Sequence, residues 1–173
     1  TRGDSGLRND KTFLVPKNFI EFRSVNYKYP NREEFALKNI NLKIDIGSKI
    51  AFVGQTGSGK TTIANQILCL LRPSSGLILF DGKPLQKKYI NTWQSFCSYV
   101  PQLINLLNAD VKKNIAYGLR EDQIDESKVL ESIEAAQLND LIKQLPNGIE
   151  TNIGENGIQL SGGQRQRIAI ARA

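Results

Sequence analysis

One segment dominates this 173-residue sequence: Gly54-Gln-Thr-Gly-Ser-Gly-Lys60-Thr61. It fits the phosphate-binding loop pattern G-x-x-x-x-G-K-[ST], in which glycines let successive backbone N–H groups curl around a phosphate. The apolar run Lys49-Ile-Ala-Phe-Val before it predicts a buried strand, and a helix is predicted after it as far as about Leu71. A plain glycine-rich turn is the alternative interpretation, but a strand before and a helix after are the context that this motif requires.

Each part of this loop has an expected task in holding a nucleotide. The ammonium of Lys60 is predicted to reach the β- and γ-phosphates, and the hydroxyl of Thr61 to coordinate Mg²⁺. The helix that follows adds its dipole and its free N–H groups. The predicted nucleotide-binding residues are therefore Gly54, Gln55, Thr56, Gly57, Ser58, Gly59, Lys60, Thr61 and Thr62.

Strands are predicted on both sides of the loop. The alternation of apolar and polar residues from Phe19 to Tyr27, and the more regular one from Ala36 to Ile46, predict an antiparallel hairpin. Pro30-Asn31-Arg32 forms the turn between them. A further strand is predicted from Gly76 to Phe80. Because strand, loop, helix and strand follow one another, we expect a mainly parallel sheet around the loop.

The character of the sequence changes after Gln102. Three helices are predicted, over Val111 to Tyr117, Ser127 to Ala136 and Leu138 to Leu145, and Pro146-Asn147-Gly148 ends the series. In the second helix the apolar side chains fall on one face. We expect these helices to form a small lobe attached to the sheet.

A second glycine-rich helix start is predicted at Ser161-Gly-Gly-Gln164. Ser161 and Gln164 have the spacing of a capping box, and Gly162 and Gly163 leave the helix N-terminus bare, which again suits an anion. Taken alone, the segment is an ordinary helix cap. Since Lys60 already supplies one nucleotide site, we expect the second start to serve a nucleotide held by another subunit.

The composition is that of a globular protein, with 40% hydrophobic and 23% charged residues. The excess of 23 Lys+Arg over 17 Asp+Glu is mild, and a solvated basic surface is favoured over a nucleic-acid site. Because the excess is mild, nucleic acid is not an expected partner. No apolar stretch approaches the roughly 20 residues that a membrane-spanning helix needs.

Two cysteines and two aromatic residues are expected in the core. Cys69 and Cys97 have no metal-ligand spacing and the chain has no histidine, so we expect reduced, buried, intracellular thiols. Trp93 and Phe96 precede a strand predicted over 97–100, and core packing is the simplest role for both.

The two glycine-rich motifs together resemble the nucleotide-binding domain of ATP-binding cassette (ABC) transporters, most closely the exporter type. Residues 54–61 match the Walker A loop, and Leu160-Ser-Gly-Gly-Gln164 matches the family's signature motif. Tyr29 resembles the aromatic residue that stacks on adenine. Gln102, in Tyr99-Val-Pro-Gln102, resembles the Q-loop glutamine that contacts Mg²⁺ and the attacking water. The resemblance runs from Phe19 to Ala173.

This resemblance implies an α/β fold: a P-loop NTPase (RecA-like) core with an N-terminal antiparallel β subdomain and an inserted α-helical subdomain, incomplete at the C-terminus. It implies ATP and Mg²⁺ as cofactors. Lys60 and Gln102 take catalytic roles, Thr61 and Gln102 are the implied metal ligands, and Tyr29, the Walker A loop and residues 161–164 hold the nucleotide. The implied division is 1–18 linker or leader, 19–102 β subdomain and P-loop core, 103–160 helical lobe, and 161–173 signature helix.

The resemblance also implies partners. Two such domains close head-to-tail around two Mg-ATP, and each works with a transmembrane domain of the same or a partner polypeptide at the cytoplasmic face of a membrane. The implied activity is ATP hydrolysis that drives transport, most closely export. The Gln102 loop and the segment Thr151-Asn-Ile-Gly-Glu155 resemble the family's contacts to the membrane part and the neighbouring domain.

The sequence departs from the family in what it lacks. The family's Walker B strand, catalytic Glu and switch His would follow the signature helix, and none is present. The chain begins without Met and ends inside a predicted helix, so we expect a piece of a longer polypeptide that is inactive alone.

Two alternatives stay open at this stage, and a third is disfavoured. One is a non-transport ABC ATPase of the DNA-repair or translation type, and another is a catalytically dead ATP-binding module. A P-loop kinase or GTPase would have no use for residues 160–164, and the guanine-reading Asn-Lys-x-Asp pattern is absent.

Overall fold

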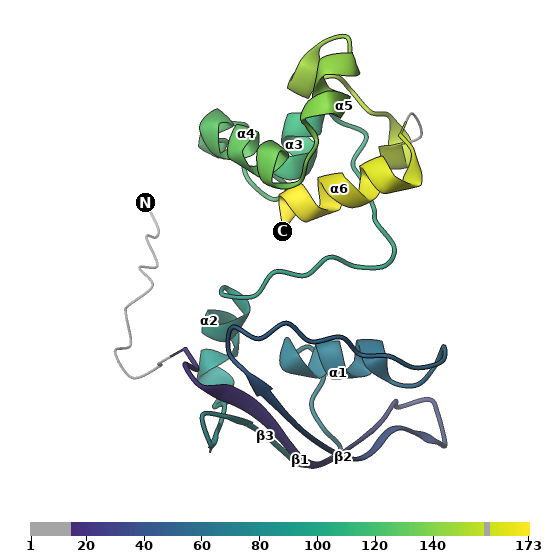
Figure 1. Ribbon diagram of the computed structural model, residues 1–173, viewed down its shortest axis with the longest axis vertical. Helices are drawn as coiled ribbons and strands as arrows, with labels where there is room; N and C mark the ends of the chain where they lie inside the picture. Colours follow the sequence, from purple (N-terminus) through teal and green to yellow (C-terminus); the bar gives the residue numbers. More distant parts are fainter. Residues whose placement is uncertain (1–14, 158–159) are drawn as a thin grey trace, which may run out of the picture. The chain divides into compact units, whose positions relative to one another are not determined.

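The computed structural model describes residues 15–157 and 160–173, and the chain divides into two compact units (Figure 1). The first unit ends at Cys97 and the second begins at Ser98. Each has a hydrophobic core of its own. The first core gathers around Phe22, Val25 and Trp93, and the second around Ile133 and Ile168.

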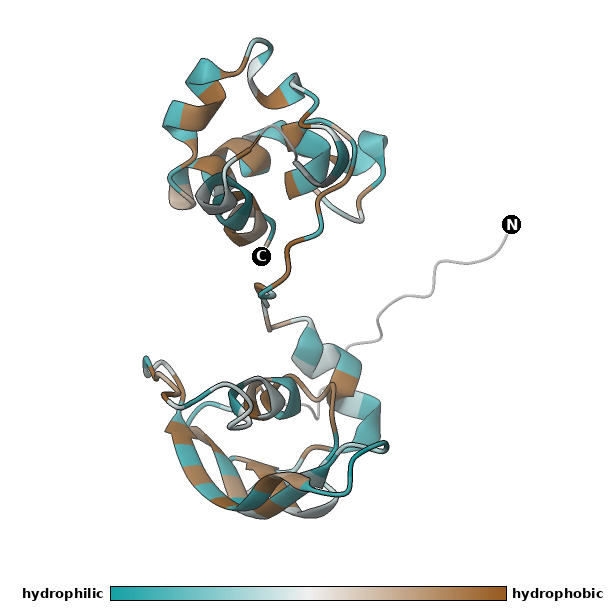
Figure 2. Ribbon diagram, turned by 90° about the vertical axis from the view of Figure 1, so that its right-hand side faces the viewer, coloured by the Kyte–Doolittle hydropathy of each residue, from teal (hydrophilic) through white to brown (hydrophobic). Residues whose placement is uncertain are grey.

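An antiparallel sheet forms the body of the first unit, with strand order β2-β1-β3-β4. The strands are β1 (Phe19–Lys28), β2 (Phe35–Asp45), β3 (Ser75–Phe80) and β4 (Lys83–Pro84). Phe22 of β1 lies opposite Leu42 of β2 and Ile78 of β3. Apolar and polar residues alternate along the strands, as the colours of Figure 2 show, because side chains of a strand point alternately to its two faces. The predicted hairpin is confirmed.

Helix α1 (Lys60–Ile67) covers one face of this sheet (Figure 1). Its Ile63 and Ile67 pack against the core of the first unit. The helix ends earlier than predicted, because Cys69 takes a left-handed backbone conformation with φ 56°. The N–H groups of Leu70 and Leu71 then both turn back to donate to the carbonyl of Asn65, which satisfies a free carbonyl of the last turn.

The predicted strand before the P-loop is not formed. Residues 49–55 have no regular structure, and Val53 is 95% exposed. A strand with apolar side chains on both faces needs neighbouring strands to pair its backbone, and the described residues contain none that pairs with this run. For the same reason the predicted mainly parallel sheet is wrong for the described part of the chain, where every strand pair is antiparallel. Residues 97–100 are not a strand either.

The segment after the sheet contains a 3₁₀ turn (Lys87–Tyr89) and α2 (Ile90–Gln94). Core packing is confirmed for Trp93, whose ring meets that of Phe80 edge-on at 5.0 Å and whose Nε1 donates to the Ile67 carbonyl at 2.8 Å. It is wrong for Phe96, which lies beyond the end of α2 and is 63% exposed among the described residues.

Both cysteines of the first unit are free and half-buried. Burial raises the pKa of the Cys69 thiol to about 11, with a smaller contribution from the neighbouring Cys97, and burial also raises the pKa of Cys97. Because the thiolate is the reactive form, both side chains are expected to react slowly near neutral pH.

The second unit is helical, as predicted. It contains α3 (Val111–Ile115), α4 (Glu126–Ala135), α5 (Asn139–Gln144) and α6 (Gly162–Arg172), joined by 3₁₀ turns at Glu121–Gln123, Gly148–Glu150 and Glu155–Gly157. On α4, Val129 and Ile133 face the core and Leu130 is half exposed. None of the helices in residues 15–157 and 160–173 is long and apolar enough to cross a membrane.

Candidate nucleotide-binding site

The loop Gly54–Lys60 leads into α1 through two glycines in the left-handed backbone region. Gly57 has φ 85° and Gly59 has φ 90°. A Cβ at Gly59 would lie 2.6 Å from Leu37 Cδ2 and 2.8 Å from the Ala36 carbonyl oxygen. Both the backbone conformation and the contact with β2 therefore require glycine at this position.

The ammonium of Lys60 lies inside the loop that precedes it. Its Nζ donates to the carbonyl oxygens of Gly54 and Gln55, both at 2.8 Å, and to Ser58 Oγ at 3.3 Å. The N–H of Ser58 also donates to the Gln55 carbonyl at 3.2 Å. The loop thus closes on itself around a positive charge that its own carbonyl groups orient.

The first turn of α1 adds hydrogen-bond donors next to this charge. The first N–H groups of a helix have no acceptor within it, and the intrahelical series begins with Ile63 N donating to Gly59 O at 2.9 Å. No side chain caps this end. A lysine ammonium beside backbone N–H groups at a helix N-terminus fits a phosphate group, so the residues present suit the nucleotide that the motif predicts.

The two threonines of this turn have different environments. Thr62 is buried, and its Oγ1 lies 3.1 Å from the Tyr29 hydroxyl. Thr61 is exposed, and within the described residues its hydroxyl has no hydrogen-bond partner. Tyr29 is half-buried, and its ring packs edge-on against Tyr27 at 4.9 Å. The Thr62 hydroxyl is therefore occupied, while that of Thr61 is available to a ligand.

The second glycine-rich start opens α6 in the second unit. The predicted capping box is confirmed: Gln164 N donates to Ser161 Oγ at 3.3 Å, and Ser161 N donates to Gln164 Oε1 at 2.8 Å. Gly162 and Gly163 are exposed, and a Cβ at either would meet no atom within 4 Å. Within the second unit, none of the described residues covers these two glycines.

Gln102 is exposed and belongs to a segment without regular structure near the start of the second unit. Tyr29 and residues 54–62 thus come together in the first unit, and Gln102 and residues 161–164 belong to the second.

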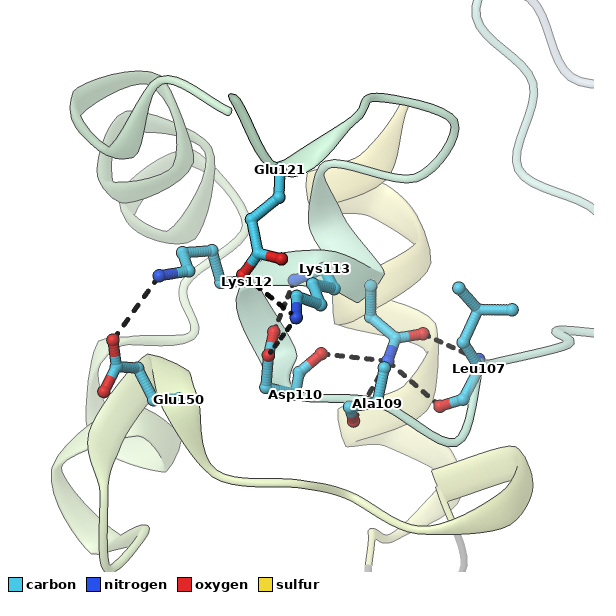
Figure 3. A network of polar contacts seen from close by, with 8 residues as sticks. Leu107, Ala109, Asp110, Lys112, Lys113, Glu121 and Glu150 are labelled. Atoms are coloured by element: carbon cyan, nitrogen blue, oxygen red, sulfur yellow. Dashed lines mark hydrogen bonds and ion pairs between the residues drawn. The ribbon is translucent and has the colours of Figure 1, made fainter. Parts of the chain in front are cut away.

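Sequence reasoning missed two groups of residues that support these motifs. Ala36 and Leu37 form the surface against which Gly59 packs. In the sequence they belong to an ordinary alternation of apolar and polar residues, so no signal distinguishes them from the other strand residues. The second group surrounds residues 107–114, where Asp110 caps α3 by accepting from Lys113 N at 2.6 Å (Figure 3). An Asp directly before a predicted helix is a capping signal that could have found this second group.

The comparisons with known proteins agree on one family. The family model for ABC transporters matches residues 37–173. The chain is 45% identical over 157 residues to an ATP-dependent lipid A-core flippase of Pectobacterium atrosepticum, covering 91% of this chain and 27% of that protein. It is 46% identical over 154 residues to the flippase of the same name from Escherichia coli K12, covering 89% of this chain and 26% of that protein.

A solved structure is similar as well. A bacterial Atm1-family ABC exporter with ATP bound matches with a TM-score of 0.82 and 34% identity, over 92% of this chain and 27% of that one. The chain spans little more than a quarter of the length of these relatives. With its Walker A loop and its signature helix start, this chain belongs to the ABC transporter family.

Proposed function

We propose that the chain is the ATP-binding part of an ABC exporter, in which ATP binding and hydrolysis drive transport across a membrane. One observation carries the proposal: two carbonyl groups of the Walker A loop hold the Lys60 ammonium beside the free N–H groups of α1. This arrangement presents positive charge and donors to one small volume, as binding of a triphosphate requires.

The remaining residues of the first unit complete a nucleotide site. Mg²⁺, when bound with ATP, neutralises charge on the β- and γ-phosphates, and the available hydroxyl of Thr61 is its proposed ligand. The hydroxyl of Tyr29 is anchored to Thr62, and we propose that the Tyr29 ring stacks on adenine. Gln102 is the proposed second contact to Mg²⁺ and to the attacking water, by its match to the Q-loop.

The signature helix start is proposed to act on a nucleotide held by a second copy of the domain. The start of α6 is uncovered, and its glycines leave room for close approach of a phosphate. In a head-to-tail dimer, residues 161–164 of one copy face the Walker A loop of the other. ATP favours closure because its γ-phosphate contacts both faces, and hydrolysis removes that contact.

Transport is the proposed use of this cycle because the similar proteins are an exporter and flippases. The proposed partners are a second nucleotide-binding domain and a transmembrane domain of the same or a partner polypeptide. The proposed site of action is the cytoplasmic face of a membrane.

Substitution of Lys60 tests the proposal in the full-length protein. Hydrogen bonds to charged groups contribute about 1.5–3 kcal/mol each, so Lys60→Ala is expected to weaken ATP binding about 100-fold or more. Titration with a fluorescent ATP analogue measures the affinity. Lys38→Ala is the matched control, because Lys38 is an exposed lysine of β2 in the same unit. Equal affinity of the two variants would refute the proposed role.

A further inference from the structure

The last turn of α6 is tied to the chain segment that follows Gln102. Arg172 donates through Nε to the Asn114 carbonyl at 2.9 Å, through Nη2 to Asn114 Oδ1 at 3.1 Å, and through Nη1 to the Asn105 carbonyl at 3.1 Å. Its guanidinium also lies 4.7 Å from the centre of the Tyr117 ring. A single side chain therefore joins α6 both to the incoming segment and to α3.

Asn114 completes this junction from the inside. Its side chain is fully buried. Its Oδ1 accepts from Leu107 N at 2.8 Å, and its Nδ2 donates to the carbonyls of Leu107 at 3.1 Å and Asp110 at 3.0 Å. Among the described residues, segment 105–110 has no strand partner other than a one-residue bridge at its end, so the Asn114 amide supplies hydrogen bonds in place of backbone pairing.

The Arg172 guanidinium is held by neutral groups. Among the residues that the structure describes, no carboxylate forms an ion pair with it, and burial lowers its pKa. Arginine nevertheless stays protonated in proteins. The hydrogen bonds of this partly buried guanidinium depend on the positions of three acceptor oxygens. Small displacements of these oxygens would weaken the bonds, so the contacts favour one geometry of the junction.

We propose that Arg172 and Asn114 are positioning residues that make segment 105–110 and helix α6 move as one rigid body. A displacement at Gln102 would then reach the signature start at Ser161–Gln164, which lies on the same helix as Arg172. Gln164 and Arg172 are eight residues apart, which corresponds to about 12 Å at the rise of an α-helix, so tilting one end of the helix displaces the other. This inference rests on the proposed function, because it assigns a use to the link between Gln102 and the signature.

A double-mutant cycle in the full-length protein tests the link. Arg172→Lys keeps the charge but removes the planar fork of donors. We expect it to lower kcat for ATP hydrolysis about tenfold, while KM for ATP stays within about twofold, because such coupling changes rates by modest factors and leaves the Walker A site intact.

The partner substitution in this cycle is Gln102→Ala. If Arg172 acts through Gln102, adding Arg172→Lys to Gln102→Ala will lower kcat no further. Arg167→Lys is the matched control, because Arg167 lies on the same helix and its Nη1 donates to the Gln137 carbonyl at 2.9 Å. Additive effects, or equal effects of the two Arg→Lys changes, would overturn the proposal. A wild-type protein that neither binds nor hydrolyses ATP would instead refute the proposed function.

A distance measurement keeps the inference testable if Arg172→Lys impairs folding. Spin labels at Asn108→Cys and Gln166→Cys, both exposed positions, report the separation of the segment and α6 in the full-length protein without other cysteines. We expect one narrow distance distribution that is the same with and without ATP. In Asn114→Ser, which leaves Arg172 in place, the distribution should broaden. A wild-type distance that changes on ATP binding would show that the two parts move separately.

Discussion

The two glycine-rich helix starts are built in opposite ways. At the start of α1, no side chain caps the helix, and a lysine ammonium occupies the preceding loop. At the start of α6, Ser161 and Gln164 satisfy each other's backbone N–H groups, and the guanidinium of Arg165 donates outside the capping box, to the Leu160 carbonyl at 2.8 Å. The first start therefore has the charge to hold an anion by itself. The second is partly satisfied by its own capping box, and its cation is directed to the preceding carbonyl, so it suits an anion that is already held elsewhere.

The largest expected effect that tests this difference comes from replacing a glycine in each helix start. In Gly59→Ala, the new methyl group would meet Leu37 and the Ala36 carbonyl, and the residue would be forced into a left-handed conformation. Such backbone strain costs about 1–3 kcal/mol, and we expect ATP affinity to fall by about two orders of magnitude as the loop is displaced.

Gly162→Ala is the counterpart in the second start. Its Cβ would meet open space, so we expect ATP affinity of the isolated site and thermal stability to stay close to the wild type. Isothermal titration and a melting curve on both variants make the comparison. A loss of affinity in Gly162→Ala as large as in Gly59→Ala would show that the two starts do not differ as described.

A smaller effect is expected from Ser161→Ala. The change removes the acceptor for Gln164 N, and loss of an N-cap costs about 0.5–2 kcal/mol of stability. Amide hydrogen exchange in the first turn of α6 should therefore become faster, while exchange in α1 stays the same. Ser161→Asp restores an acceptor and should recover most of the protection. Unchanged exchange in α6 would mean that the capping box does not hold its first turn.

The smallest expected effect concerns pH. The cap of α6 is neutral, whereas Asp125 caps α4 by accepting from Ser127 N and Lys128 N. The hydrogen bond from the Ser127 side chain, followed by that from Lys128 N, holds the pKa of Asp125 below its usual value. Because the folded pKa is lower than the unfolded one, this contribution is present above the unfolded pKa and is lost as pH falls through the folded pKa.

The amides of Ser127 and Gln164 report the two caps in an NMR titration. On acidification we expect the Ser127 resonance to shift with the protonation of Asp125, while that of Gln164 follows no such transition. Asp125→Asn should abolish the shift at Ser127. A shared midpoint at both amides would indicate general acid unfolding and would contradict the comparison.

Local patterns were predictable because their causes lie within a few residues. The capping box, the hairpin of β1 and β2, and the glycine loop before α1 depend on residue types at fixed short spacings. The strand predicted at Lys49–Val53 is wrong for the described residues, because a strand requires partners that these residues do not supply, and no local pattern reports whether partners are present. The apolar side chain of Phe96 likewise suggested core packing, whereas its exposure depends on what lies beyond the end of α2.

The sequence alone predicted the chemistry proposed for this protein: a loop with the lysine and glycines that suit a phosphate, and a second glycine-rich helix start proposed to complement it. These properties follow from residue identity and short spacing. Only the tertiary structure decided which threonine is available, why Gly59 admits no side chain, and how Arg172 joins α6 to the segment after Gln102. Those contacts join residues that are far apart in the chain, and packing, rather than any local pattern, brings them together.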